Sequence, residues 1–252
     1  MIDPRKISFI IPTLGQNSNS LIHNLERIRT FSKCSEILVV TCAESDELIH
    51  LLGNYEARYL YCEKNGVFNA LNTGISSLKP EIEYFVFLGD DDCIVPENFK
   101  AMTNQDKIEN IDIIFGSVVV KNEQGQRIYT NRSTRFAHKL LLFTPNFIPL
   151  PGTLIKKNLC KEVGSFSEKY YLASDLDFWL KTRKRASFKK YQRVVAEFRL
   201  SEKTLTGGLR DISTRESSEI RNKHVTRCKG IYRAYEKGMT KVTEKVYRYV
   251  SK

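Results

Sequence analysis

The sequence predicts an α/β protein with a mixed, mainly parallel sheet flanked by helices, followed by a helical extension at the carboxyl end. The sheet is predicted by short apolar runs that alternate with helix-patterned segments through the first half of the chain. The extension is predicted by residues 211–252, whose pattern is helical and basic. With 252 residues, 41% of them hydrophobic, the chain can form a sizeable core. We expect an α/β domain over residues 1–208 and a basic helical extension over 209–252, packed on it or beside it.

Four apolar runs in the first half are predicted strands, and segments with helical spacing separate them. The predicted strands are residues 7–11, 37–40, 59–61 and 84–88. The first helix is expected to begin near Asn17 or Ser18 and the third near Asn65. Both helix starts follow a strand, so their free N–H groups lie where such sheets bind anions. The residues expected to face inward are Leu21, Leu25 and Ile28 in the first helix and Phe68, Leu71 and Ile75 in the third.

The second half is less regular, and we expect the sheet to become mixed there. The predicted elements are a strand at 111–121, a turn at 123–126, its hairpin partner at 127–130, a helix at 175–185 and a strand at 192–200. Prolines and glycines are frequent between residues 133 and 170, which indicates a surface rich in loops.

Three adjacent carboxylates follow the fourth predicted strand. Asp90, Asp91 and Asp92 come directly after a run of five apolar residues and Gly89. Such a run is typical of a strand buried on both faces, and ligands bind at the carboxyl ends of parallel strands. Adjacent anions repel one another unless a cation joins them, and hard divalent cations prefer carboxylate and phosphate oxygens. The triplet therefore indicates a metal site; the alternative is a solvated acidic turn.

The charge of the chain favours acidic partners. Its 40 Lys and Arg residues outnumber 29 Asp and Glu residues, which gives a formal charge of +11. Phosphorylated substrates, anionic membranes and nucleic acid all fit that charge. The six cysteines form no C-x-x-C pair, and the sequence shows neither a secretion signal nor a run long enough to span a bilayer. We therefore expect a reducing, cytoplasmic location.

Several segments in one order resemble the family 2 glycosyltransferases of the GT-A (Rossmann-like) fold, over roughly residues 6 to 225. The family's first strand, which ends in Pro-Thr, is similar to residues 7–13, and its Gly-Ile-Tyr-Asp-Ala-Met-Asn-Lys-Gly-Ile segment is similar to residues 66–75. Residues 87–92 resemble its D-x-D element. Residues 164–168 and 173–181 resemble the acceptor-side segment that carries the general base.

The resemblance implies an inverting, metal-dependent hexosyltransferase that uses a nucleotide-sugar donor. In such an enzyme Asp92, with Asp90, ligates Mn2+ or Mg2+ at the donor diphosphate, and Asp90 or Asp91 contacts the ribose or the sugar. Asp175 is then the general base that deprotonates the acceptor hydroxyl. The alternative for Asp175 is a helix N-cap, and the two roles are compatible.

Further residues are candidate contacts of the donor or the acceptor. Pro12, Thr13, Asn65 and Asn72 are candidate donor contacts; Thr13 can instead bond its own loop, and Asn72 its nearby backbone. Asp177 is a candidate acceptor contact or a helix-dipole partner. Trp179, the only tryptophan, is a candidate sugar platform, although the core is the favoured place for so large a side chain.

Departures from the family pattern limit what can be transferred. The aspartate pair that reads the uracil is replaced by residues 39–44, with Glu44 as a substitute. Leu150 and Pro151 occupy the places of a His-Gln pair, and Arg210 replaces the serine of a Gly-Gly-hydrophobic-Ser motif. Arg210 is a candidate diphosphate contact or a structural arginine.

The stretch from Arg221 onward carries ten Lys and Arg residues against two Glu residues, interrupted by aliphatic and aromatic side chains. It predicts an amphipathic helical tail that binds an anionic leaflet, or else a solvated helix or a homodimer contact. The expected location is then the cytoplasm or the inner face of the cell membrane.

The leading hypothesis is transfer of a sugar from a UDP-sugar to a lipid-linked or growing bacterial surface glycan, such as O-antigen or capsule. One alternative is a nucleotidyltransferase, disfavoured because residues 12–17 contain one glycine and no lysine. The other is a non-enzymatic nucleic-acid-binding protein, which leaves the acidic triplet unexplained, so we expect no nucleic acid partner. The sequence fixes neither the donor sugar, the acceptor, the linkage nor the oligomeric state.

Overall fold

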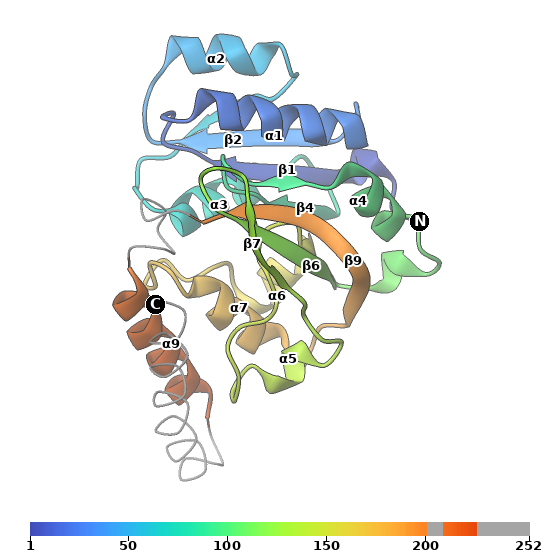
Figure 1. Ribbon diagram of the computed structural model, residues 1–252, viewed down its shortest axis with the longest axis vertical. Coiled ribbons are helices and arrows are strands. Elements are labelled where there is room, and N and C mark those ends of the chain that lie inside the picture. Colours follow the sequence, from blue (N-terminus) through green and yellow to red (C-terminus); the bar gives the residue numbers. More distant parts are fainter. Residues whose placement is uncertain (201–208, 226–252) are drawn as a thin grey trace.

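The computed structural model describes residues 1–200 and 209–225, which form one nine-stranded sheet covered by helices on both faces (Figure 1). The strand order is β3-β2-β1-β4-β8-β6-β9-β5, and β7 pairs with β6 outside this path. The basic tail from residue 226 onward lies outside the described residues.

The first four strands in this order are parallel, as the alternation of strands and helices predicted. They are β3 (Arg58–Tyr61), β2 (Glu36–Thr41), β1 (Ile7–Pro12) and β4 (Tyr84–Phe87). β1 pairs with both β2 and β4, so it lies at the centre of this half. Since all four strands run in one direction, their carboxyl ends meet at one edge of the sheet.

The other half is mixed, also as predicted. Its strands are β8 (Leu154–Lys156), β6 (Ile113–Lys121), β9 (Phe188–Arg199), β5 (Cys93–Ile94) and β7 (Arg127–Asn131). β8 runs antiparallel between β4 and β6 and joins the two halves. β6 and β9 are parallel, and β6 and β7 form the predicted hairpin. The two strands that the sequence did not predict, β5 and β8, have two and three residues and are too short to show a period.

The helices divide between the two faces because consecutive strand residues point to opposite sides. Phe9 and Ile11 of β1 belong to one core, whereas Ile10 belongs to the other. The first core is covered by α1 (Ser18–Phe31), α2 (Asp46–Gly53) and α4 (Pro96–Thr103). The second is covered by α3 (Val67–Ser76), α6 (Asn158–Val163), α7 (Ser174–Thr182) and, through Ile220, α9 (Arg210–His224). Shorter helices are α5 (Ala137–Leu140), η1 (Pro4–Lys6) and η2 (Ile108–Asn110).

The predicted inward faces of the first and third helices are confirmed. All six predicted residues are buried: Leu21, Leu25, Ile28, Phe68, Leu71 and Ile75. In the described part of the chain, no helix combines the length and the apolar character needed to cross a bilayer.

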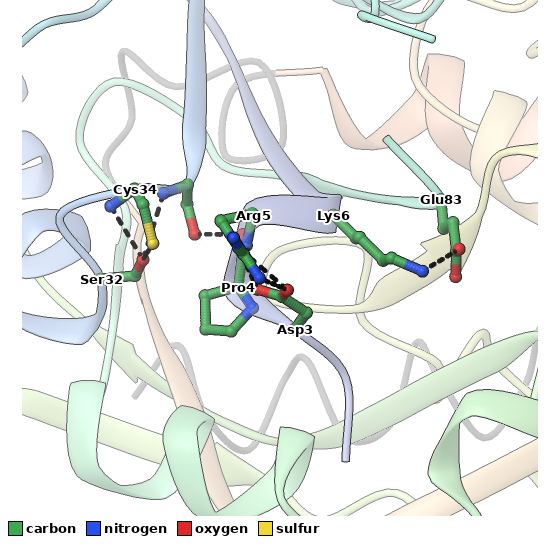
Figure 2. Close-up of polar contacts among 8 residues, drawn as sticks. Asp3, Pro4, Arg5, Lys6, Ser32, Cys34 and Glu83 are labelled. Carbon is green, nitrogen blue, oxygen red and sulfur yellow. Dashed lines mark hydrogen bonds and ion pairs between the residues drawn. The ribbon is translucent and has the colours of Figure 1, made fainter. Parts of the chain in front are cut away.

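The amino ends of the strands carry charges that pair with one another (Figure 2). Lys6 Nζ lies 2.6 Å from a Glu83 carboxylate oxygen, and Arg5 makes a bidentate contact with Asp3. Ser32 Oγ lies 3.4 Å from the Cys34 thiol in the same group of contacts. These polar groups lie at the amino edge of the parallel strands, and the acidic triplet lies at the carboxyl edge.

Gly74 lets α3 approach β1 closely, and this contact is testable. A Cβ at Gly74 would overlap the side chain of Ile10, which is fully buried. We expect Gly74→Ala to reduce the free energy of unfolding by roughly 1–3 kcal/mol, because the core has no room for the methyl group. Gly53→Ala is the matched control, since a Cβ there meets nothing within 4 Å. Urea denaturation of both variants measures the difference; equal midpoints would show that this contact is not tight.

Candidate active site

The pairing of β1 with β4 brings the first two predicted site residues together. Ile10 is in register with Phe87, so continuing both strands by three residues places Thr13 opposite Asp90. The Thr13 hydroxyl donates a 2.6 Å hydrogen bond to Asp90 Oδ2 and also accepts one from the backbone N–H of Gly15. Both sequence interpretations of Thr13 are therefore compatible: it bonds its own loop and faces the acidic triplet.

The loop from Gly89 to Asp92 is fixed from three directions. Asn24, fully buried on α1, donates to the Gly89 carbonyl at 2.9 Å. Asp92 Oδ2 accepts the Gly89 N–H at 2.9 Å, and Asp92 Oδ1 accepts the Arg199 N–H at 3.3 Å from the end of β9. The Asp92 carboxylate is thus held by backbone groups of two different elements, and only 2% of the residue is exposed.

Burial raises the pKa of all three carboxyl groups. For Asp92 and Asp91, burial is the main cause and the neighbouring carboxylate adds to it. Burial also raises the pKa of Asp90, although the Thr13 hydrogen bond opposes the shift. The positive charge of the Arg199 guanidinium opposes this shift and acts to lower the pKa of Asp91. A site that raises the pKa of three adjacent carboxyl groups favours a bound cation over three free negative charges.

Gly89 leaves room beside two of these carboxylates. A Cβ on Gly89 would lie 2.9 Å from Asp92 Oδ2 and 3.1 Å from Asp91 Oδ1, so both oxygens lie beside the Gly89 Cα. Asp91 is therefore the closer companion of Asp92, whereas Asp90 is bonded to Thr13. No three His, Cys, Asp or Glu side chains are grouped as a complete metal-binding set in the described ranges. Two or three carboxylates completed by phosphate oxygens remain compatible with Mg2+ or Mn2+.

Asp175 lies at the start of α7, half-buried, with both carboxylate oxygens engaged. Oδ2 accepts a 2.8 Å hydrogen bond from Asn146 Nδ2, and Oδ1 accepts the Leu176 N–H at 2.7 Å. Burial raises the pKa of Asp175 to about 6, while these hydrogen bonds and the charge of Arg221 oppose the shift. A carboxylate with such a pKa is ionised near neutrality and is more basic than an exposed one.

The loop that carries Asn146 also reaches the strand that carries the acidic triplet. The Gly152 N–H donates to the carbonyl of Phe87, the last residue of β4, at 3.1 Å, and Pro151 forms a bridge with the same residue. One short segment, residues 146–152, thus contacts Asp175 at one end and the strand before Asp90 at the other.

Helix α9 holds the elements around Asp175. The Glu216 carboxylate accepts hydrogen bonds from the backbone N–H groups of Tyr171, Leu172 and Ala173 at 2.8, 2.9 and 3.0 Å, just before α7. One turn later, Arg221 donates to the carbonyls of Leu141 and Thr144, in the segment leading to Asn146. Both sides of the Asn146–Asp175 contact therefore depend on α9.

The other predicted donor residues lie at the ends of β2 and β3. The Asn65 side chain accepts a hydrogen bond from the Cys42 thiol, which follows β2. Glu44 is exposed two residues later. Beside them, a pocket opens between the start of α1 and α2; it is lined by Thr13, Gly15, Asn17, Ser18, Leu21, Ser45, Glu47, Leu48 and Leu51. The side chain of Arg210 lies outside what the structure describes.

Three predicted residues have structural partners. Asn72 forms two hydrogen bonds with the backbone of Phe166, 94 positions away, and so fastens α3 to the segment before α7. Asp177 pairs with Lys181 at 2.7 Å and His224 at 3.2 Å. Burial acts to raise its pKa, but these partners lower it overall. Trp179 is fully buried against Phe178, the core position that its size favours, so no face of the indole is open to a sugar.

Four residues of this site were not predicted from the sequence: Asn24, Asn146, Arg199 and Glu216. Arg199 is the last residue of β9, a strand that was predicted, so its place at the carboxyl edge could have identified it as a site residue. The other three act through contacts between residues far apart in the chain. Glutamate is also common on the surface of any helix, so Glu216 does not stand out in the sequence. No local pattern distinguishes them.

The chain belongs to glycosyl transferase family 2, because the sequence profile of that family matches residues 8–173. An uncharacterised glycosyltransferase of Rickettsia typhi is 30% identical over 186 residues, which cover 69% of this chain and 58% of that protein. An uncharacterised glycosyltransferase of Haemophilus influenzae is 24% identical over 201 residues, which cover 74% of this chain and 65% of that protein. The chain thus spans less than two thirds of the length of these relatives.

The fold is similar to that of solved glycosyltransferase structures. The crystal structure of S. aureus TarS 1–349 in complex with UDP has a TM-score of 0.61 at 18% identity, covering 87% of this chain and 65% of that one. The complex of the same protein with UDP-GlcNAc has a TM-score of 0.60 at 17% identity, and the match covers 85% of this chain and 66% of that one. The GT-A fold predicted from the sequence is confirmed by this likeness.

The contact of Glu216 with the start of α7 is testable. We expect Glu216→Ala to reduce the free energy of unfolding by roughly 1–3 kcal/mol, because three N–H groups lose their acceptor. Glu219→Ala is the matched control on the same helix: its carboxylate pairs with Lys169, and both side chains are at least half exposed. Thermal unfolding of both variants makes the comparison. A melting temperature lowered equally by the two changes would contradict the special role of Glu216.

Proposed function

We propose that the protein is an inverting, metal-dependent glycosyltransferase that takes a sugar from a UDP-sugar. The observation that carries the proposal is the connection of two carboxylate centres by one loop. The triplet Asp90–Asp92 follows β4, and Asp175 lies at the start of α7. The segment from Asn146 to Gly152 bonds Asp175 at one end and Phe87, the last residue of β4, at the other. Family membership and the likeness to a UDP-binding protein support the same chemistry.

Asp92, with Asp91 or Asp90 beside it, would hold Mn2+ or Mg2+. The fit rests on carboxylate oxygens of Asp91 and Asp92 that both lie beside Gly89, and on the pKa values of these two groups, which burial and mutual repulsion raise. When bound, such a cation neutralises the charge that develops on a departing nucleoside diphosphate. Arg199, whose guanidinium lies near Asp91 and bonds Ser20, adds a fixed positive charge at this edge.

The pocket between α1 and α2 is the proposed place of the nucleoside. Thr13 lines it and also bonds Asp90, so a ligand here adjoins the acidic loop. Four backbone N–H groups at the start of a helix lack intrahelical partners, and the start of α1, with Asn17 and Ser18, lines the same pocket. Asn65 and Glu44 border the neighbouring strand ends, while Pro12 precedes Thr13 at the end of β1.

Asp175 is the proposed general base. The acceptor oxygen attacks the anomeric carbon as the bond from that carbon to the diphosphate oxygen breaks, and the hydroxyl proton passes to Asp175. Attack from the face opposite the leaving group inverts the configuration. Asn146 holds the carboxylate in one orientation, and its hydrogen bond favours the ionised form.

The proposed acceptor is a lipid-linked or growing bacterial glycan, met at the cytoplasmic face of the cell membrane. The +11 charge of the chain and its basic sequence beyond Arg221 support an anionic surface as partner. A thermal-shift screen of nucleotide sugars with and without manganese tests the donor class. Stabilisation by UDP-sugars supports the proposal; indifference to every nucleotide sugar would remove it.

The role of Asp92 leads to a first prediction. We expect Asp92→Ala to lose the manganese-dependent part of UDP binding, by roughly tenfold or more in Kd, because the central carboxylate of the cation site is gone. Titration calorimetry with and without manganese measures it. Asp106→Ala is the control, an acidic residue of the loop after α4. Unchanged metal dependence in Asp92→Ala would overturn the assignment.

The role of Asp175 leads to a second prediction. Asp175→Asn is expected to bind donor normally but to lose about 10²-fold or more in kcat. In the wild type, kcat/KM for the acceptor should fall as the pH drops below about 6, because the base becomes protonated.

Asn146→Leu provides the check on this assignment. It removes a hydrogen bond that lowers the pKa, so the acidic limb of the pH profile should move to higher pH. A pH profile that is the same in Asn146→Leu and the wild type would contradict the assignment of that limb to Asp175.

A further inference from the structure

A long stretch in the second half of the chain has no negative charge. Residues 124–161 contain seven Lys and Arg residues and no Asp or Glu, although the whole chain has 29 carboxylate residues in 252. Lys156 and Lys157 have partners: Lys156 pairs with Asp112 at 3.8 Å, and Lys157 donates to backbone carbonyls. The charge of the remaining cations points to an anionic partner outside the chain.

The centre of this stretch is α5, which exposes apolar side chains between the cations. Phe136 is 45% and Leu140 is 41% exposed, and a spacing of four residues puts them on one side of the turn. Arg135 Cζ lies 4.5 Å and Lys139 Nζ 5.7 Å from the centre of the Phe136 ring. We call this surface, made by Arg132, Arg135, Phe136, Lys139 and Leu140, the α5 patch. Arg132, Arg135 and Lys139 are exposed and have no carboxylate partner in residues 1–200 and 209–225.

The opposite side of α5 is anchored in the protein. Ala137 and Leu141 are buried in the second core, and the His138 ring stacks on Phe188 of β9 at 4.6 Å. Exposure of Phe136 and Leu140 is therefore not a consequence of a detached loop. The core holds α5 in one orientation with these two side chains facing out.

The residues that follow α5 contact α9 and lead to the residue that bonds the candidate base. Arg221 of α9 donates to the Leu141 and Thr144 carbonyls, directly after α5. Figure 1 shows α5 and α9 toward one end of the long axis of the molecule and α2 at the other. The chain continues from α9 into the basic sequence 226–252, and the segment from α5 continues to Asn146, which bonds Asp175.

We propose that the α5 patch docks the protein on an anionic lipid bilayer, with Phe136 and Leu140 entering the interface and Arg132, Arg135 and Lys139 contacting lipid phosphates. Aromatic and aliphatic side chains flanked by Lys and Arg are the combination that binds such an interface. Nucleic acid fits less well, because Arg135 lies over the Phe136 ring and Leu140 cannot stack on a base. The α5 patch shares no residue with the basic sequence 226–252. If the proposed function holds, it also brings a lipid-linked acceptor to Asp175.

Insertion of Phe136 can be measured directly in the full chain. Phe136→Trp adds a second tryptophan to one that is fully buried, and vesicles of phosphatidylglycerol and brominated phosphatidylcholine quench an indole that reaches the acyl region. Ile49→Trp is the matched control: Ile49 is 47% exposed on α2, at the other end of the molecule. We expect quenching of Phe136→Trp only. Equal quenching of both variants would overturn the proposal. So would the absence of quenching in Phe136→Trp protein that co-sediments with the vesicles.

The charge contribution is tested by vesicle co-sedimentation. Arg135→Ser/Lys139→Ser is expected to lower the partition coefficient on phosphatidylglycerol vesicles roughly tenfold or more. Lys33→Ser/Lys79→Ser removes the same charge from the segments before β2 and β4, and is expected to have less than one third of that effect. Equal losses in both variants, or retention of RNA without vesicle binding, would refute the α5 patch as a membrane surface. UDP binding measured on the same samples shows separately whether the proposed function holds.

Discussion

The parallel pairing of β1 with β4 is the contact on which the candidate site depends. Its register continues past both strands and sets Thr13 against Asp90, so the acidic triplet has one fixed place. Such a loop is intrinsically unfavourable, because three carboxylates are crowded where water is scarce. The structure offsets this through N–H groups of Gly89 and Arg199 and through Asn24. A bound cation would relieve the remaining repulsion without protonating the carboxylates, so the loop suits a metal and a diphosphate.

The second centre is built from elements that come late in the chain. Asp175 begins α7, and stacked rings of Phe68, Phe166 and Phe178 tie that helix to α3. α9 then fixes both α7 and the segment with Asn146, through Glu216 and Arg221. Although the family profile ends at residue 173, the residues around Asp175 are held in place by contacts from beyond that boundary. Helix α9 is therefore part of the site's framework.

Much of the fold follows from local patterns, but the site follows only in part. The parallel strands, the inward faces of α1 and α3, and the β6–β7 hairpin each follow from a local signal in the sequence: an apolar run, helical spacing or a turn. The short strand β8, inserted antiparallel between β4 and β6, has no such signal, because three residues are too few to show a period. Asp92 was identifiable because it follows a buried strand. Asn146 and Glu216 were not, because their roles arise from contacts with residues 29 and 43 to 45 positions away.

The location of the metal relative to Asp175 is the most direct test of this account. Anomalous diffraction from a crystal grown with manganese and UDP locates the ion without assumptions about mechanism. The account predicts a manganese peak at about 2.0–2.3 Å from a carboxylate oxygen of Asp92. It also predicts that the uridine lies beside Thr13 and that the diphosphate lies on the side of the metal that faces Asp175. A manganese peak elsewhere, or UDP bound away from both carboxylate centres, would contradict it.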